Sequence, residues 1–201
     1  IGNMDKNIYS EASKLKVLFF SAMAIEYVIP LVNALSRLDI EIVLVTSSKC
    51  ISEVPKNSIS KNVKVFKLDI QSPFFKPSNF SSMRTLIKIT NNEKPDLIHI
   101  QSHGHDLFFI TLPFIFRIPI INTVHDIDRH LGEERLISRI RKFFGVFFSS
   151  RYIVHGQSLK RKFLNQYSTS LKEDTIDVIP VSTGGMMKKW QKKEVLEEPN
   201  T

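Results

Sequence analysis

The sequence has little cysteine and lacks the segments that mark secreted or membrane-spanning proteins. Cys50 is the one cysteine among 201 residues, so no internal disulfide can form, which is typical of a reducing compartment. Residues 1–14 are polar and do not predict a signal peptide. No apolar run reaches the roughly 20 residues that a membrane-spanning helix needs. Together these absences predict a cytoplasmic protein.

Two glycine-rich phosphate-binding patterns are also absent. The turn after the first predicted strand, residues 21–24, holds no glycine, which excludes a Gly-x-Gly-x-x-Gly dinucleotide fingerprint. No Lys follows a glycine run, which excludes a P-loop. Gly184 and Gly185 form a pair whose backbone N–H groups can contact a phosphate. An ordinary flexible turn explains this pair equally well.

Positive charge is concentrated in one part of the chain. The net charge is +8, and residues 129–162 hold nine basic residues against two acidic ones. A basic helix predicted at residues 133–148 mixes arginines with phenylalanines, which favours contact with the anionic inner face of a membrane. Alternatively, the phenylalanines belong to the core and the arginines form a solvated face. The residues expected at the membrane surface are Arg139, Arg141, Lys142 and Phe143. No nucleic-acid-binding module is present, so nucleic acid is not an expected partner.

Strand-like and helical segments alternate along the chain. This alternation indicates βαβ units and predicts a Rossmann-like parallel α/β sheet of about seven strands flanked by helices. The first strand reads as buried on both faces, and residues 63–68 as a more exposed, edge-like strand. The predicted strands are residues 16–20, 41–46, 63–68, 97–100, 120–124, 152–155 and 177–181.

The helices of this pattern have predicted boundaries as well. Ser21 and Ser158 are predicted to cap the helices that follow them. Pro30 lies inside an apolar helical stripe, which predicts a kink or a late helix start. Residues 71–82 read as a loop and residues 83–91 as a helix.

Histidines gather where the predicted strands end. Ligands of open α/β sheets bind beyond the carboxyl ends of the strands. His125, followed by Asp126, comes directly after a buried strand, which gives the imidazole a rigid mount. The alternative is that such histidines are polar loop residues. The histidines expected in this region are His103, His105, His125 and His130, with His155 at the end of its own strand.

Metal binding by the histidines and nucleophilic catalysis by the cysteine are two other chemistries that the sequence supports less completely. His103, His105, His125 and Asp126 are possible zinc ligands, so a metal-dependent hydrolase is one alternative function. Cys50 lies in a predicted loop after a strand, but no histidine is placed by sequence to activate it as a nucleophile.

Several segments together resemble one known family. They are residues 16–20, 95–103, 119–126, 152–158 and 177–185. In this order and spacing they resemble the N-terminal half of family 4 glycosyltransferases, which have the GT-B fold. The resemblance covers residues 15–185.

The resemblance implies retaining transfer of a sugar from a UDP- or GDP-sugar to a glycan or lipid-linked acceptor, as in polysaccharide biosynthesis, without a metal or other cofactor. It implies that His125 lies by the donor sugar as a catalytic residue. It places Ser21 and Ala22 near the donor phosphates, although glycines are common in that loop in the family and are absent here. His103, Asp126 and Gly184 complete the expected substrate-binding set.

The resemblance also implies a domain plan. Residues 1–14 are expected to be a disordered or tag-like tail, and residues 15–187 an acceptor-binding domain. Residues 188–201 read as a linker toward a C-terminal nucleotide-sugar domain that the chain lacks, so the chain alone is expected to be inactive. A non-catalytic module that binds a sugar, a nucleotide or a membrane surface stays open as an alternative.

Overall fold

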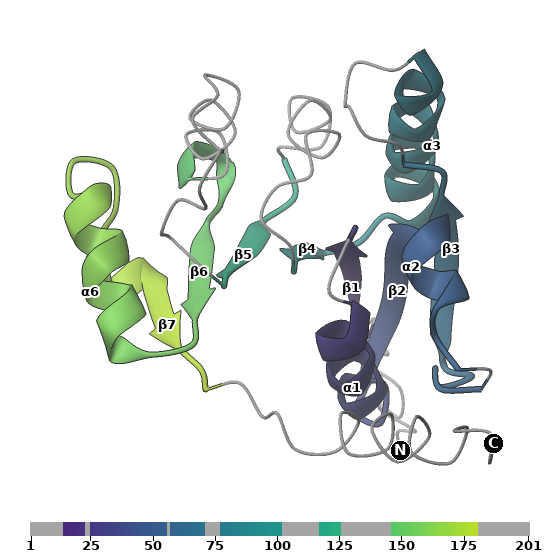
Figure 1. Ribbon diagram of the computed structural model, residues 1–201, viewed down its shortest axis with the longest axis horizontal. Helices are drawn as coiled ribbons and strands as arrows, with labels where there is room; N and C mark the ends of the chain where they lie inside the picture. Colours follow the sequence, from purple (N-terminus) through teal and green to yellow (C-terminus); the bar gives the residue numbers. More distant parts are fainter. Residues whose placement is uncertain are drawn as a thin grey trace, which may run out of the picture.

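The computed structural model describes residues 14–22, 25–55, 57–70, 77–101, 117–125 and 146–180 of the chain. These residues form an α/β unit built on one sheet, which runs from β3 at the right of Figure 1 to β7 at the left. Most of the predicted tail and all of the predicted linker lie outside the described residues.

The sheet of the described residues has seven strands, all parallel, in the order β3-β2-β1-β4-β5-β6-β7. The predicted Rossmann-like fold is therefore confirmed, and each predicted strand is present with small shifts at its ends. The strand at residues 63–68 lies at one edge, as its alternating pattern predicted. The strands are β1 (Leu15–Ser21), β2 (Ile40–Ser47), β3 (Val63–Leu68), β4 (Leu97–Ile100), β5 (Ile120–Val124), β6 (Arg151–Val154) and β7 (Ile176–Val178).

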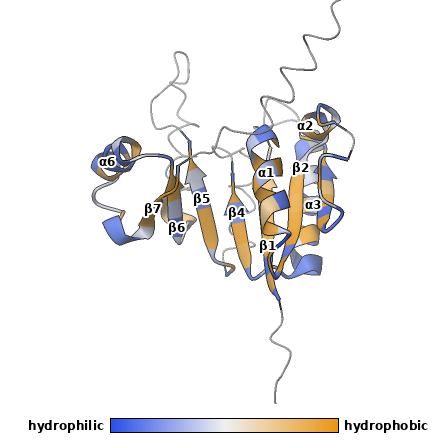
Figure 2. Ribbon diagram, turned by 90° about the horizontal axis from the view of Figure 1, so that it is seen from below, coloured by the Kyte–Doolittle hydropathy of each residue, from blue (hydrophilic) through white to orange (hydrophobic). Residues whose placement is uncertain are grey.

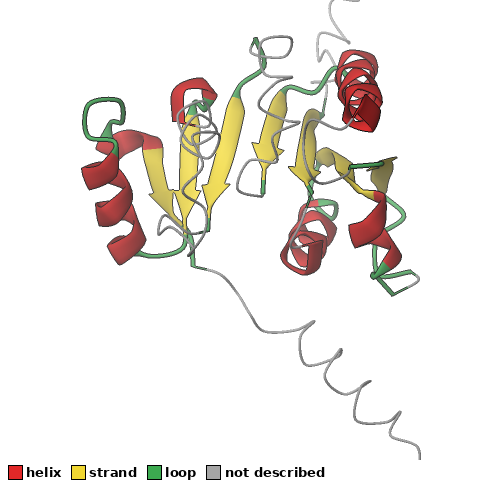
Figure 3. Cartoon of the chain, turned by 45° about the horizontal axis from the view of Figure 1, so that its top comes forward, coloured by secondary structure: helices red, strands yellow, loops and turns green. Residues whose placement is uncertain are grey.

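Helices cover both faces of the sheet (Figure 3). Right-handed crossovers place the helices between β1, β2 and β3 on one face, and the return crossing from β3 to β4 on the other. Accordingly α1 packs on one face, called here the α1 face, and α3 packs on the opposite face, the α3 face. The helices are α1 (Ile25–Leu35), α2 (Ser48–Ser52), α3 (Pro77–Glu93) and α6 (Gln157–Gln166), with a 3-10 turn at Glu173–Thr175.

The central strand β1 is buried on both faces, as predicted. Its side chains alternate, because successive residues of a strand point to opposite faces. Val17 and Phe19 pack on the α1 face, whereas Leu18 and Phe20 pack on the α3 face. The orange strands at the centre of Figure 2 show this apolar middle of the sheet. The ends of β2 and β4, which pair with β1, are therefore held by a closely packed strand.

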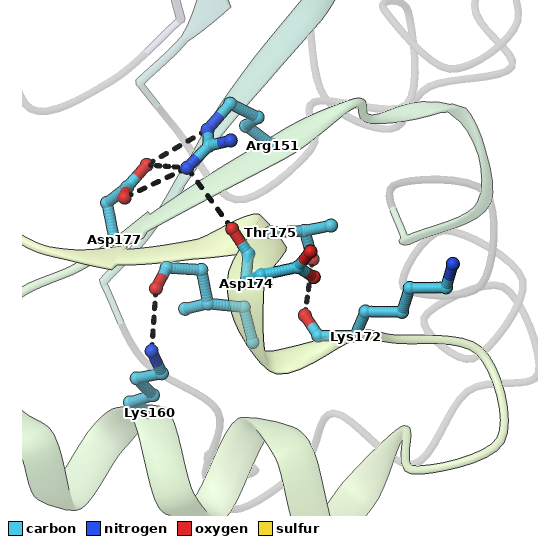
Figure 4. A network of polar contacts seen from close by, with 7 residues as sticks. Arg151, Lys160, Lys172, Asp174, Thr175 and Asp177 are labelled. Carbon is cyan, nitrogen blue, oxygen red and sulfur yellow. Dashed lines mark hydrogen bonds and ion pairs between the residues drawn. The ribbon is translucent and has the colours of Figure 1, made fainter.

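Polar contacts tie the last strand to β6 and α6 (Figure 4). The Arg151 guanidinium donates hydrogen bonds to both carboxylate oxygens of Asp177 at 3.0 Å and to the Asp174 carbonyl at 3.2 Å. The Lys160 ammonium donates to the Ile176 carbonyl at 2.9 Å. These contacts hold the short strand β7 in register at the sheet edge.

Several predicted local features are wrong. Ser21 is the last residue of β1 and Ser158 lies inside α6, whose N-cap is Gly156, so neither serine caps a helix. Helix α3 begins at Pro77, inside the predicted loop, because proline suits the first turn of a helix. Cys50 lies in the short helix α2 and not in a loop.

Pro30 lies within a continuous helix. Helix α1 runs from Ile25 through Pro30, so the predicted late start is wrong. Proline removes one helical N–H bond, to the carbonyl four residues earlier. Pro30 is exposed and that carbonyl belongs to the first turn, so water can take the place of the missing donor.

Candidate functional site

The carboxyl ends of β4, β5 and β6 bring polar side chains together on the α1 face. Along β1 and β2 this face is apolar and is packed under α1. Phe19 pairs in register with His99 of β4, and the two rings are 4.9 Å apart between centroids. Side chains alternate along a strand, so every second residue of β4, β5 and β6, counted from the residue in register with His99, points to this same face. The polar residues that follow there are His99, Gln101, Thr123, His125 and His155.

His125 is fixed directly after β5. Its Nε2 lies 2.9 Å from the backbone carbonyl oxygen of Gln101, and a carbonyl only accepts, so Nε2 carries the proton. The Tyr27 ring of α1 lies 6.3 Å from the His125 ring between centroids. Burial lowers the pKa of His125, the contact with Gln101 opposes this, and the charge of His155 lowers it further. His125 is thus an oriented imidazole at the strand end, as predicted, and it is partly buried.

His155 contacts His125 from the next strand end. Its Nε2 is 3.2 Å from Nδ1 of His125, and the two rings lie 4.8 Å apart between centroids. Its Nδ1 lies 2.9 Å from the Ile179 carbonyl and donates to it. The two histidines follow adjacent strands, which explains why they meet.

A buried polar layer supports His125 from below. His99 is 7% exposed, and its Nε2 lies 2.8 Å from the Thr123 hydroxyl and 3.1 Å from the Gln101 amide nitrogen. An amide nitrogen only donates, so Nε2 of His99 accepts and the ring proton is on Nδ1. Burial lowers the pKa of His99 to about 4, with the charge of His125 as the second cause. His99 is therefore neutral near pH 7.

The end of β1 is close-packed. Ser21 and Ala22 are both buried, and the thiol of Cys50 donates to the Ala22 carbonyl at 3.0 Å. Thr46 pairs in register with Ser21, and its hydroxyl is buried without a hydrogen-bond partner among the described residues. The contact of Ser21 and Ala22 with donor phosphates stays a prediction.

Other predicted residues lie outside the described part of the chain. They are His103, His105, Asp126, His130, Gly184, Arg139, Arg141, Lys142 and Phe143. Among the described residues no group of three or more His, Cys, Asp or Glu side chains is placed to hold a metal ion, and no helix is long and apolar enough to cross a membrane. The metal site and the membrane surface stay predictions. Phe147, near the end of the predicted basic helix, is 68% exposed.

Sequence reasoning missed His99 and Gln101 as parts of this site. Both lie in or directly after a strand that reads as buried, so they did not stand out as loop residues. Alternation along residues 97–101 is the signal that places both on one face. Their pairing with Thr123 required the strand order as well.

A family comparison matches most of the chain. The sequence model of Glycosyltransferase Family 4 matches residues 26–181. This match and the sheet order confirm the predicted resemblance to the N-terminal half of a GT-B fold. No curated protein matches the chain in a direct comparison.

Solved structures share the fold. UDP-GlcNAc 2-epimerase from Neisseria meningitidis, bound to UDP-GlcNAc, has a TM-score of 0.63 at 16% identity, over 90% of this chain and 51% of that one. A glycosyltransferase from Rickettsia africae has a TM-score of 0.61 at 14% identity, over 94% and 51%. HepE from Anabaena, in complex with UDP and glucose, has a TM-score of 0.57 at 17% identity, over 91% and 50%. The chain spans about half the length of each of these proteins.

Proposed function

Because the chain belongs to glycosyltransferase family 4, we propose that it forms the acceptor-binding half of a retaining glycosyltransferase. The donor is a UDP- or GDP-sugar, and the acceptor is a glycan or a lipid-linked sugar. The Neisseria epimerase and Anabaena HepE, which share the fold, are described in complex with UDP-GlcNAc and with UDP and glucose. This supports a nucleotide sugar as the ligand class.

One observation carries the proposal: His125 is held at the carboxyl end of β5 with its ring oriented by the Gln101 carbonyl. Ligands of such sheets bind at this edge. A rotamer fixed by a strand end and a backbone hydrogen bond is a preorganised contact for a sugar. His125 is therefore our candidate for the catalytic contact with the donor sugar.

The described contacts also constrain how the donor binds. Both ring nitrogens of His125 have partners in this structure, the Gln101 carbonyl and His155. A sugar hydroxyl therefore takes the place of one of them, or the ring acts on the donor through its charge. In the same proposal Ser21 and Ala22 contact the donor phosphates through their backbone, since their side chains are buried.

The remaining parts of the site come from outside the described residues. We place His103, Asp126 and Gly184 around the substrate. Residues 188–201 form a linker to a second domain that supplies the nucleotide site, a plan supported by the half-length match to the solved structures. The chain alone is then inactive or nearly so.

We place the protein on the cytoplasmic side, at the membrane surface. The basic segment with Arg139, Arg141, Lys142 and Phe143 would face anionic lipid and bring the enzyme to a lipid-linked acceptor. The exposed Phe147 supports this placement, because a phenylalanine ring gains by burial at the boundary between headgroups and acyl chains. Co-sedimentation with anionic vesicles tests it, with neutral vesicles as the control.

The assay that tests the proposed function uses the two-domain protein. Candidate UDP- and GDP-sugars are incubated with glycan and lipid-linked acceptors, and the product is analysed by NMR at the anomeric carbon. We expect a transferred sugar with the anomeric configuration of the donor. A product of inverted configuration contradicts the retaining mechanism. An epimerised sugar without transfer contradicts the transferase itself.

A further inference from the structure

His125 and His155 form the centre of a row of three polar contacts along the carboxyl edge of the sheet. The row begins at the Ile179 carbonyl, which lies 2.9 Å from Nδ1 of His155. It continues across the 3.2 Å contact from Nε2 of His155 to Nδ1 of His125. It ends at the Gln101 carbonyl, 2.9 Å from Nε2 of His125. All four ring nitrogens of the two histidines are engaged.

The number of protons in this row follows from hydrogen-bond chemistry. A carbonyl oxygen only accepts, so Nδ1 of His155 and Nε2 of His125 each carry a proton. Two neutral imidazoles have one N–H each, and both are used on the carbonyls. The two nitrogens that face each other would then both be acceptors. A hydrogen bond between them needs a third proton, and the pair then carries one positive charge.

We propose that His125 and His155 share one proton between their facing nitrogens, and that His155 is the positioning residue that orients and charges His125. A pair without the shared proton loses one of the three contacts. A pair with a fourth proton sets N–H against N–H, because every ring nitrogen is then a donor. Among the contacts of the described residues, this arrangement therefore matches a single positive charge on the pair.

The groups around the pair agree with this count. Outside the pair, two titratable side chains of the described residues interact with His125: His99 from β4 and Tyr27 from α1. Burial keeps His99 neutral near pH 7, since its pKa is about 4. Burial is the first cause of the lowered pKa of His125 and opposes a charge on this ring; the charge of His155 lowers that pKa further, so a second proton on the pair is disfavoured. The ion pair of Arg151 with Asp177 lies four residues upstream, at the start of β6.

The positive charge of the pair can assist sugar transfer at this edge of the sheet; this role rests on the proposed function. When the bond from the sugar carbon to the donor phosphate breaks, its electron pair stays on the departing phosphate oxygen. A fixed cation beside the sugar site attracts that oxygen without giving up its own proton. His155 is then needed for turnover although it does not itself contact the sugar.

NMR on the histidine-labelled chain tests the proton count without any activity. Long-range ¹H–¹⁵N spectra report the protonation of each ring nitrogen and are recorded from about pH 9 to about pH 5, the range in which histidine titrates. We expect the signals of His125 and His155 to move together as the pair takes up one proton. Independent titration of the two rings, or two neutral rings over the whole range, overturns the proposal.

Two substitutions separate the contact at Nδ1 of His125 from the charge of the pair. The amide of His155→Gln can donate to Nδ1 of His125, so it keeps His125 in the Nε2–H form without the shared proton. His155→Leu removes the contact at Nδ1 as well as the shared proton, and we expect the Nδ1 signal of His125 to differ from that in the wild type and in His155→Gln, while Nε2 stays protonated against the Gln101 carbonyl. Arg161→Gln on α6 also deletes a positive charge and should leave the His125 spectrum unchanged. A His125 spectrum that is the same in the wild type and in both His155 variants contradicts the role of His155.

Turnover in the two-domain protein tests the charge. We expect His155→Gln to lower kcat by about tenfold or more and to flatten its pH profile, with little change in the KM of the acceptor. An unchanged kcat and pH profile in this variant contradict the charging role. If no variant or wild type transfers sugar, the proposed function fails, while the NMR result on the shared proton still decides the pair.

Discussion

The α1 face of the sheet has two halves that differ in composition and in role. Along β1 and β2 it presents apolar side chains under α1, with Val17, Phe19 and Leu44 almost fully buried. Along β4, β5 and β6 the same face ends in His99, Thr123 and the histidine pair. Both halves belong to one sheet, in which β2, β1, β4, β5 and β6 pair in succession. The difference teaches that the apolar half packs the sheet against α1, whereas the polar half carries the side chains of the candidate site.

The largest stability effect is expected in the apolar half. Leu44 is fully buried, so Leu44→Ala leaves a cavity and should lower the free energy of unfolding by about 2–5 kcal/mol. Urea unfolding measures this change. Ile42→Val, two residues earlier on the same strand, is the matched control and should cost about 0.5–1.5 kcal/mol. Equal losses in the two variants would contradict tight packing under α1.

A pH effect is expected from the polar half. The pKa of His99 falls from 6.5 to about 4 on folding. Between these values the unfolded chain binds a proton that the folded chain does not, so stability is full above pH 6.5 and is lost as the pH falls toward 4. The loss from this group amounts to about 3 kcal/mol.

Unfolding measured near neutral pH and again near the pKa of His99 checks this effect. His99→Gln does not titrate and keeps a polar group near Thr123. We expect the variant to lose less stability than the wild type over the same pH interval. If the two lose the same amount, His99 does not titrate as its burial predicts.

A smaller effect is expected from the Thr123 hydroxyl. Thr123→Val keeps the shape of the side chain but removes one contact of Nε2 of His99, which keeps the Gln101 amide as a partner. The free energy of unfolding should fall by about 1 kcal/mol. A loss as large as that of Leu44→Ala would show that the polar half is as important for stability as the apolar half.

Much of the fold and part of the site could be predicted from the sequence. The periods of strands and helices predicted the seven strands, and the position of His125 directly after a buried strand agrees with the structure. Two predicted helix starts are wrong. Ser21 belongs to β1, where it pairs in the sheet, and α3 begins earlier than predicted, at Pro77, because proline suits the first turn of a helix. The contact of His125 with His155 could not be predicted, because it depends on the register of the adjacent strands β5 and β6. The contact with Gln101 could not be predicted either, because it uses a backbone carbonyl, which every residue has.

The central claim is that the polar half acts in sugar transfer through His125. The most direct measurement compares turnover and unfolding of His125→Ala with the wild type, in the two-domain protein with its donor and acceptor. We predict that turnover falls by at least about a hundredfold, while the free energy of unfolding changes by no more than about 1 kcal/mol. A variant that folds normally and keeps near-normal turnover would contradict the claim.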